Sequence, residues 1–275
     1  MGRAALQHLV ETARENHAIL IERSGQTALF SVDPPSPSGS PTRPFSIVVE
    51  LRRGTPVARE QTPQVLPSFC PERHINGDGT FCLSWAELDP LEIVDLETAG
   101  AWWRKLLVFL QRQRTAATRR RWPGKTDARA HGSEAAWHQA VAELAAQELG
   151  AKFVNGLRGE RFTTSRRRRG DETRVRLLHE DRRLATVIEV PGRLVGRVMT
   201  LRAPCPCGGD ARRSRALRSC GNHAEMLAKF TLAIDGWCRA EAEFFAEIAR
   251  NGHICCGTMD GCPLASQTAT IATAA

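Results

Sequence analysis

The residue best suited to chemistry in the first half of the chain is Cys82, which follows a run of turn-forming residues, Asn76-Gly77-Asp78-Gly79. Such residues supply the positive φ angles of a tight loop, and their polarity favours the protein surface. Arg73 and His74 make the approach to this loop basic. A guanidinium or imidazole near a thiol favours the thiolate, which is the nucleophilic form. The segment therefore predicts a presented, reactive cysteine.

Cys70, His74 and Cys82 also fit a second interpretation, because three such side chains could bind a metal ion instead. No obvious fourth ligand lies near them in the sequence. The polar turn before Cys82 favours presentation of a thiol, and Cys70 is expected to be a packed thiol beside the loop.

Seven of the nine cysteines fall between Cys205 and Cys262. Two short pairs, Cys205/Cys207 and Cys220/His223, are separated by about a dozen residues, and Pro206 with two following glycines favours a tight turn at the first pair. Three thiolates and one imidazole are a ligand set typical of tetrahedral zinc. The spacing therefore predicts a structural zinc site.

A second group of possible ligands is less regular: His253, Cys255, Cys256 and Cys262, with Cys238 on a preceding helix. Four of these five could hold a second zinc ion, although none forms a C-x-x-C pair. Cys238 also fits a small buried apolar residue. Cys255-Cys256 also fits a redox-active or acyl-accepting pair, so the sequence predicts one or two zinc ions.

Composition excludes several classes of protein. The chain has 275 residues, 42% hydrophobic and 25% charged, which is typical of globular domains. No apolar run approaches the ~18 residues of a membrane span. The N-terminus is amphipathic and reaches Glu11 early, unlike a secretory signal. We therefore expect a cytoplasmic protein with no membrane partner. Because thiols stay reduced in the cytosol, its cysteines are expected to be metal ligands or nucleophiles.

The net charge of +8 is concentrated in two arginine runs, Arg119–Arg121 and Arg166–Arg169. Such runs bind nucleic-acid phosphates or form a solvated face. The chain contains no tyrosine, which weakens the case for a base-stacking surface. Nucleic acid is therefore not an expected partner, although a basic zinc-binding module that binds nucleic acid stays an alternative.

The run His74-Ile75-Asn76-x-x-Gly79-x-Phe81-Cys82-Leu83 resembles the active-site segment of ubiquitin-conjugating enzymes, and CPERHIN-x-DG-x-FCL is close to its bacterial form. Trp102-Trp103 and Arg121-Trp122-Pro123 fit that branch as well. The resemblance covers roughly residues 1 to 150 and implies that Cys82 carries a modifier as a thioester. His74 stands where the family has the asparagine that polarises the thioester carbonyl. His74 and Asn76 are therefore the candidates for the oxyanion contact.

The later part of the chain is similar to the cysteine-rich proteins associated with bacterial conjugating-enzyme domains. This resemblance implies a ubiquitin-activating-type enzyme, a ubiquitin-like modifier and a deconjugating metalloprotease as partners, in a setting of bacterial antiviral defence. A catalytically inactive relative that docks other components of such a system is the alternative.

Hydrophobic periodicity and turn residues predict an α+β chain. The resemblance implies that a conjugating-enzyme-like domain precedes a mainly helical cysteine-rich domain. The expected domains are residues 1–155 and 174–266, joined by an Arg-rich linker at 156–173 and followed by a disordered tail at 267–275. The expected helices are 3–21, 98–115, 133–150 and 223–250. The expected strands are 27–32, 45–51, 64–69, 174–178, 184–189 and 194–201.

Overall fold

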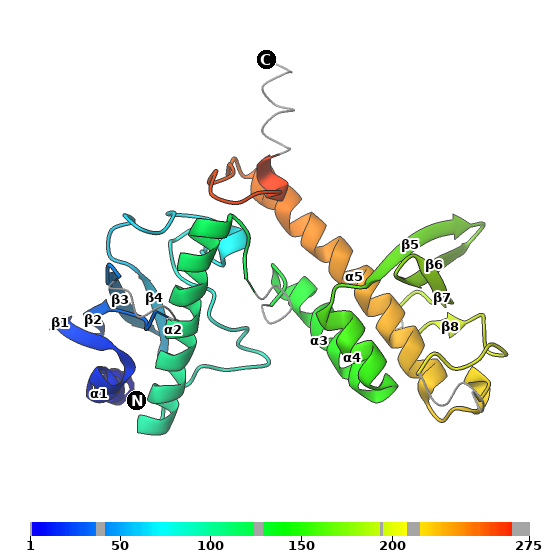
Figure 1. Cartoon of the computed structure of the whole chain (residues 1–275), viewed down its shortest axis with the longest axis horizontal. Coiled ribbons are helices and arrows are strands. Elements are labelled where there is room, and N and C mark those ends of the chain that lie inside the picture. The colour runs from blue at the N-terminus through cyan, green and yellow to red at the C-terminus, as the bar shows by residue number, and fades with distance from the viewer. Residues whose placement is uncertain (1, 37–41, 124–128, 193–194, 208–214, 266–275) are drawn as a thin grey trace, which may run out of the picture. The chain divides into compact units, whose positions relative to one another are not determined.

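The structure is a computed structural model that describes residues 2–36, 42–123, 129–192, 195–207 and 215–265. The chain divides into two compact units, which Figure 1 shows in one view. The first unit is Met1–Pro123 with Gly252–Ala275, and the second is Gly124–Asn251. Each unit contains helices and one antiparallel sheet, so the predicted α+β class is confirmed.

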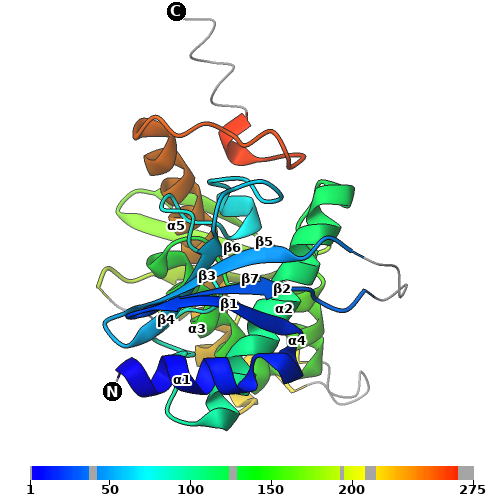
Figure 2. The same ribbon diagram turned by 90° about the vertical axis from the view of Figure 1, so that its left-hand side faces the viewer.

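The first unit is built on a sheet with the strand order β1-β2-β3-β4, in which all neighbours are antiparallel (Figure 2). Its strands are β1 Ala18–Ser24, β2 Thr27–Val32, β3 Phe45–Arg52 and β4 Thr55–Glu60. In β2, Ala28, Phe30 and Val32 are buried and alternate with half-buried residues, the period expected of a strand with one face on the core. The core therefore lies against one face of this sheet.

Helices α1 (Gly2–Thr12) and α2 (Leu96–Arg119) complete that core. Trp103 of α2 packs edge-on against Phe30 with ring centroids 5.0 Å apart, and its indole N–H donates to the Leu9 carbonyl oxygen of α1 at 3.0 Å. The helix begins at a capping box, because Asp95 accepts a hydrogen bond from the Thr98 backbone N–H at 2.8 Å. These contacts fix the helix that follows the Cys82 loop.

The C-terminal segment, residues 252–265, belongs to the first unit. Arg120, directly after α2, donates to Asp260 Oδ1 at 2.7 Å and to the Gly257 carbonyl oxygen at 3.0 Å. The His253 ring lies 4.6 Å from the Phe69 ring. The chain thus returns, after 128 residues in the second unit, to residues that flank the Cys82 loop.

In its described residues, the second unit packs three α-helices with a second antiparallel sheet, in the order β5-β6-β7-β8 (Figure 1). The long helix α5 contacts α3 and all four strands, and its Leu227, Phe230 and Ile234 are buried in the shared core. The elements are α3 Ser133–Leu149, α4 Ala151–Arg158, β5 Phe162–Arg169, β6 Glu172–His179, β7 Arg182–Glu189, β8 Arg197–Val198 and α5 His223–Arg250.

The second unit begins at Gly124, earlier in the chain than the expected boundary at residues 156–173. Residues 156–173 are not a linker: they contain the end of α4, strand β5 and the turn to β6. Phe162 is buried, and Arg166 pairs with Asp235 of α5 and Glu189 of β7. The arginine run misled the prediction because arginines on a half-exposed strand have the composition of a loop.

Other elements also differ from expectation. The first helix ends at Thr12 instead of continuing to 21: a 3-10 turn, η1 (Arg14–Asn16), and His17 in a left-handed conformation (φ 55°) follow it before β1 begins at Ala18. Strand β4 was not predicted, and 64–69 forms no strand.

No helix in the described residues is long and apolar enough to cross a membrane. The tail predicted at 267–275 lies outside the described residues.

Candidate active-site loop and candidate metal centre

Cys82 follows a loop that the backbone pins on both sides. Cys70 and Ile75 exchange two backbone hydrogen bonds, with N···O distances of 3.2 and 3.0 Å, and the Phe81 N–H donates to Ala58 of β4 at 2.8 Å. The Cys82 N–H donates to the His74 carbonyl oxygen at 2.9 Å. The thiol is therefore held at the end of a braced hairpin next to the sheet, and its side chain is exposed.

Polar side chains inside the loop hold its turn. Asp78 Oδ1 accepts hydrogen bonds from the Thr80 backbone N–H (3.0 Å) and hydroxyl (2.6 Å), and Arg52 donates to Asp78 Oδ2 at 2.6 Å. Desolvation raises the pKa of Asp78, but these hydrogen bonds outweigh it and bring the pKa to about 2. Asn76 donates from its side chain to Thr80 Oγ1 at 3.0 Å. Asn76, a candidate oxyanion donor, thus has a structural role in the loop.

His74 occupies the position expected of a residue that shapes the thiol site. It has φ 55°, caps the short helix η2 (Pro71–Arg73), and is 8% exposed. Its ring lies 5.0 Å from the Trp122 ring at an angle of 56°. A positive φ is uncommon in residues other than glycine, and Asn, Asp and His are enriched there. The left-handed backbone at His74 therefore orients the carbonyl oxygen that accepts the hydrogen bond from the Cys82 N–H.

The expected thiolate activation by the basic approach is not what the structure gives. Desolvation by surrounding protein atoms raises the pKa of Cys82 above its ordinary value. The Arg73 guanidinium is buried and turned into the protein, where it donates to Gln113 Oε1 at 2.7 Å and to the Gln113 carbonyl oxygen at 3.1 Å. Gln113 donates back to the Arg73 carbonyl oxygen at 2.6 Å. Arg73 anchors the loop to α2, and Cys82 rests as a thiol.

Two acidic residues that follow the loop in sequence, Asp89 and Asp95, both have other partners. Asp89 pairs with Lys105. Asp95 is the N-cap of α2, and hydrogen bonds from Thr98, first from its backbone N–H, hold the pKa of Asp95 below its usual value. Neither carboxylate is positioned as a base by any contact in the described residues.

A second contact near the loop had no signal in the sequence. Cys70 Sγ lies 3.0 Å from Cys256 Sγ, although 186 residues separate the two in the chain. The hydrogen bond with Cys256 and desolvation raise the pKa of Cys70. The bond from Cys70 is the largest cause that lowers the pKa of Cys256 to about 5, against desolvation and with help from Thr258 and Arg73. Cys70 is buried, as expected of a packed thiol, and its sulfur contacts that of Cys256.

Four predicted metal ligands of the second unit converge. His223 Nδ1 lies 3.3 Å from Cys205 Sγ and 3.3 Å from Cys220 Sγ, and the Cys207 and Cys220 sulfurs are 4.0 Å apart. All four ligand atoms lie within 4.8 Å of one another. Desolvation, followed by neighbouring thiols, raises the pKa of Cys205 to about 12. Such a thiol ionises readily only when a cation compensates the charge.

Local structure positions these ligands. His223 is the first residue of α5, and its backbone N–H donates to the Cys220 carbonyl oxygen at 3.1 Å. Cys205 follows a bridge between Pro204 and Ala216, and its N–H donates to Arg215 at 2.9 Å. Zinc with bonds of about 2.3 Å to sulfur and 2.0–2.1 Å to nitrogen separates tetrahedral ligand atoms by about 3.5–3.8 Å. The observed distances fit such an ion, so a Cys3His metal centre is supported.

The residues predicted for a second zinc ion are not gathered in this way. In the described part of the chain, no further set of three or more histidine, cysteine or carboxylate ligand atoms converges. The His253 ring contacts the Phe69 ring at an angle of 40°, and Cys256 contacts Cys70. Desolvation first, and then the neighbouring Cys255, raise the pKa of Cys262 to about 11. These are pairs rather than a tetrahedral ligand set.

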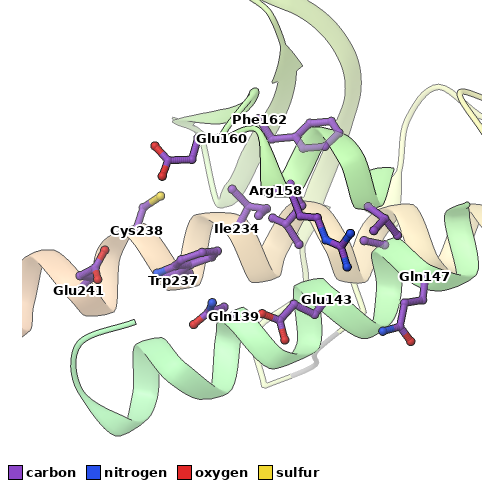
Figure 3. Close-up of a pocket in the computed structure, with 13 residues that line it drawn as sticks. Gln139, Glu143, Gln147, Arg158, Glu160, Phe162, Ile234, Trp237, Cys238 and Glu241 are labelled. Atoms are coloured by element: carbon purple, nitrogen blue, oxygen red, sulfur yellow. The ribbon is translucent and has the colours of Figure 1, made fainter. Parts of the chain in front are cut away.

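Cys238 belongs to a different setting. It is exposed rather than buried, and it lines a cavity of about 440 Å³ in the second unit (Figure 3). Trp237 and Ile234 form part of the apolar wall, and Glu143 and Glu241 contribute carboxylates. Nothing in this cavity brings another sulfur to Cys238, so its predicted role as a ligand has no geometric support.

The arginine runs proposed for a nucleic-acid alternative are partly engaged in the fold. Arg166 is paired with Asp235 and Glu189, and Arg120 holds the C-terminal segment through Asp260. Both runs therefore contribute to packing, which removes part of the argument for a phosphate-binding surface.

The sheet, the two helices and the loop ending at an exposed cysteine have the order of a conjugating-enzyme domain, and a cysteine-rich domain follows. Comparison with known families agrees: residues 16–124 match the model described as "Prokaryotic E2 domain", and residues 130–264 match "Cysteine-rich domain, C-terminal to E2 domain". No curated protein and no solved structure matches the chain. The two matches together show a prokaryotic E2 domain followed by a cysteine-rich domain.

Proposed function

We propose that the protein is a conjugating enzyme of a bacterial ubiquitin-like modification system and carries the modifier as a thioester on Cys82. The observation that supports this most strongly is the exposed Cys82 thiol at the end of a braced loop within an E2 domain. We place this activity in the cytoplasm, because a nucleophilic thiol and thiolate ligands require a reducing compartment.

Loading is a thioester exchange. The Cys82 sulfur attacks the carbonyl carbon of a modifier held as a thioester on an activating enzyme. A new S–C bond forms, and the cysteine of the activating enzyme leaves as a thiolate. The Cys82 proton passes to a base in the complex or to solvent. Since one thioester replaces another, this step needs little driving force from the protein.

The raised pKa of Cys82 suits a carrier. A thiol with a high pKa is a poorer leaving group than one with a low pKa. The thioester on Cys82 is therefore less exposed to attack by chance nucleophiles. In exchange, transfer depends on stabilisation of the developing oxyanion by the loop.

We propose His74 as the residue that stabilises this oxyanion, either through a ring N–H or by orienting a backbone amide of the loop. Its support is the left-handed backbone at His74, the bond from Cys82 N–H to the His74 carbonyl, and the near-complete burial of the side chain. Preorganised donors of this kind contribute about 2.7–4 kcal/mol each. Asn76 is the second candidate, although its amide already bonds Thr80.

We further propose that Cys205, Cys207, Cys220 and His223 hold a structural zinc ion. The ion would supply a cross-link among these four side chains. The residues that hold it join the segment before η4 (Leu217–Ser219) to the first residue of α5. The partners implied by this proposal are an activating enzyme, a ubiquitin-like modifier and a deconjugating metalloprotease.

The test is loading in vitro. The purified chain is mixed with ATP and with the activating enzyme and ubiquitin-like protein encoded beside its gene, and the products are separated on a non-reducing gel. A modifier adduct that disappears on reduction is expected. Absence of any adduct, from components that load the activating enzyme itself, would identify an inactive docking protein instead.

A further inference from the structure

The contact between Cys70 and Cys256 joins two parts of the first unit that the proposed chemistry does not use. Cys70 is 1% exposed and lies directly before the η2 turn and the Cys82 loop. Cys256 is half-buried and lies in the C-terminal segment. Their sulfurs are 3.0 Å apart. A disulfide bond of about 2.05 Å requires an approach of only about 1 Å.

The surroundings of Cys256 favour an anionic sulfur. The Thr258 hydroxyl lies 3.0 Å from Cys256 Sγ, and the Arg73 guanidinium lies 3.4 Å from the same hydroxyl oxygen. Arg73 is itself fixed by Gln113 of α2, so its charge cannot swing away from the pair. A hydroxyl, a second thiol and a buried cation around one accessible sulfur are the environment of a reactive cysteine.

We infer that Cys70 and Cys256 are a hydroperoxide-oxidisable pair, in which Cys256 reacts first and Cys70 closes a reversible disulfide. The half-buried Cys256 can meet a small oxidant, whereas the buried Cys70 reaches only its neighbour. The assignment rests on the sulfur contact and on this difference in exposure.

The electron and atom balance needs one hydroperoxide. The Cys256 thiolate attacks one oxygen of hydrogen peroxide, the O–O bond breaks, and hydroxide leaves, which gives a sulfenic acid on Cys256. Cys70 then attacks the Cys256 sulfur. The S–S bond forms as the S–OH bond breaks, and the hydroxyl leaves as water with the Cys70 proton. The hydroxide takes up the proton that Cys256 released on ionisation, so in total two thiols are oxidised and one peroxide is reduced to two waters. A dithiol reductant reverses the reaction.

Such a disulfide would tie the C-terminal segment covalently to the backbone beside the active-site loop. Cys70 exchanges backbone hydrogen bonds with Ile75, and the intervening His74 accepts the bond from the Cys82 N–H. Oxidation is therefore expected to make the C-terminal segment resistant to detachment from the first unit. This inference stands whether or not Cys82 carries a thioester.

Peptide mapping tests the pair. The full-length, reduced protein is treated with hydrogen peroxide, alkylated with N-ethylmaleimide under denaturing conditions and digested with trypsin. Trypsin is expected to release residues 60–73, which contain Cys70 as their single cysteine. The expected product is that peptide joined to the C-terminal peptide through Cys256, located by fragmentation, and lost on reduction before alkylation.

Two variants assign the order of reaction, and two act as controls. Cys256→Ser should leave Cys70 fully alkylated after peroxide. Cys70→Ser should stop the reaction at a sulfenic acid on Cys256 that dimedone traps. Cys255→Ser and Cys238→Ser should still form the cross-link. Recovery of Cys70 and Cys256 as separate alkylated peptides at peroxide doses that oxidise Cys82 would overturn the inference. So would a second equivalent of bound metal that is lost in Cys256→Ser.

Discussion

The candidate active-site loop of the first unit and the candidate metal centre of the second differ in how many sulfurs they bring together. In the first, Cys82 stands apart: in the described structure its sulfur has one hydrogen-bond contact, with the Ser84 carbonyl oxygen at 4.0 Å. In the second, the ligand atoms of three cysteines and one histidine all lie within 4.8 Å of one another; these residues are Cys205, Cys207, Cys220 and His223. Both thiol sites raise a pKa by desolvation. The proposed carrier therefore differs from the proposed metal ligands in the number of neighbouring sulfurs, and not in the direction of the pKa shift.

A tight local turn builds each site, but the turns do different things. The Asp78-to-Thr80 bonds hold a loop that projects one thiol. The Cys220-to-His223 turn at the start of α5 folds two ligands back toward Cys205. An isolated sulfur suits the proposed acyl carrier, and converging sulfurs suit the proposed metal site.

The largest effect is expected at Cys82. Cys82→Ala should abolish the modifier adduct, because no other exposed sulfur is held at the end of this loop. Cys82→Ser should form an oxygen ester that survives thiol reagents, since an alkoxide leaves less readily than a thiolate. Gel analysis with and without reductant checks both results. Cys238→Ser, which removes an exposed thiol of the second unit, is the matched control and should load normally. An adduct of unchanged amount in the alanine variant would remove Cys82 from its role.

The next effect concerns metal removal. If the four converging ligands hold zinc, binding contributes of order 10 kcal/mol to the folding of the second unit. Elemental analysis should find one zinc per chain, and Cys207→Ser should lose it and expose α5 to protease. The first unit should keep its ability to load Cys82, because its core shares no residue with the second core. Cys238→Ser again serves as the control. Metal-free protein with an intact, protease-resistant second unit would argue for free thiols.

Both sites were predictable because their residues are close in sequence. The turn at Asn76–Gly79 and the pairs Cys205/Cys207 and Cys220/His223 encode their geometry within short spans, and α5 was expected at its observed bounds. The resemblance around Cys82 was confirmed as far as the match to a prokaryotic E2 domain extends. Carriage of a modifier stays a prediction.

The long-range contacts had no local signal. Arg73 looked like part of a basic approach to Cys82, but its partner is Gln113, 40 residues away. Arg166 looked like part of a linker until Asp235 of α5 was found opposite it. Whether an arginine is solvated or packed depends on a tertiary partner that charge patterns do not reveal. The same limit hid the contact between Cys70 and Cys256.

A smaller effect is expected at His74. His74→Ala should slow transfer by about 2–4 kcal/mol of barrier if the imidazole supplies an oxyanion contact, and should slow loading less. Alanine also disfavours the observed φ of 55°, so the backbone needs its own control. His74→Gly removes the ring at no conformational penalty, and His74→Asn keeps a donor that tolerates this φ. Single-turnover rates should fall in both Gly and Ala but recover in Asn. Equal rates in the Gly variant and the original chain would assign His74 a structural role alone.

The smallest effect compares two thiols of the same unit through their pH dependence. The pKa of Cys82 is raised, so over pH 6 to 8 its thiolate fraction, and with it the rate of alkylation by iodoacetamide, should rise nearly tenfold per pH unit. The pKa of Cys256 is about 5, so its thiolate fraction is already close to complete and its rate should be nearly flat over the same range. Mass-spectrometric quantification of both peptides from one reaction gives the two slopes under identical conditions. Cys70→Ser should steepen the Cys256 profile by removing the hydrogen bond that lowers its pKa, and should leave the Cys82 slope unchanged. A flat profile at Cys82 would mean that the loop lowers the pKa of this thiol instead of raising it. Cys82 would then differ from the proposed metal ligands in the direction of its pKa shift as well as in the number of neighbouring sulfurs.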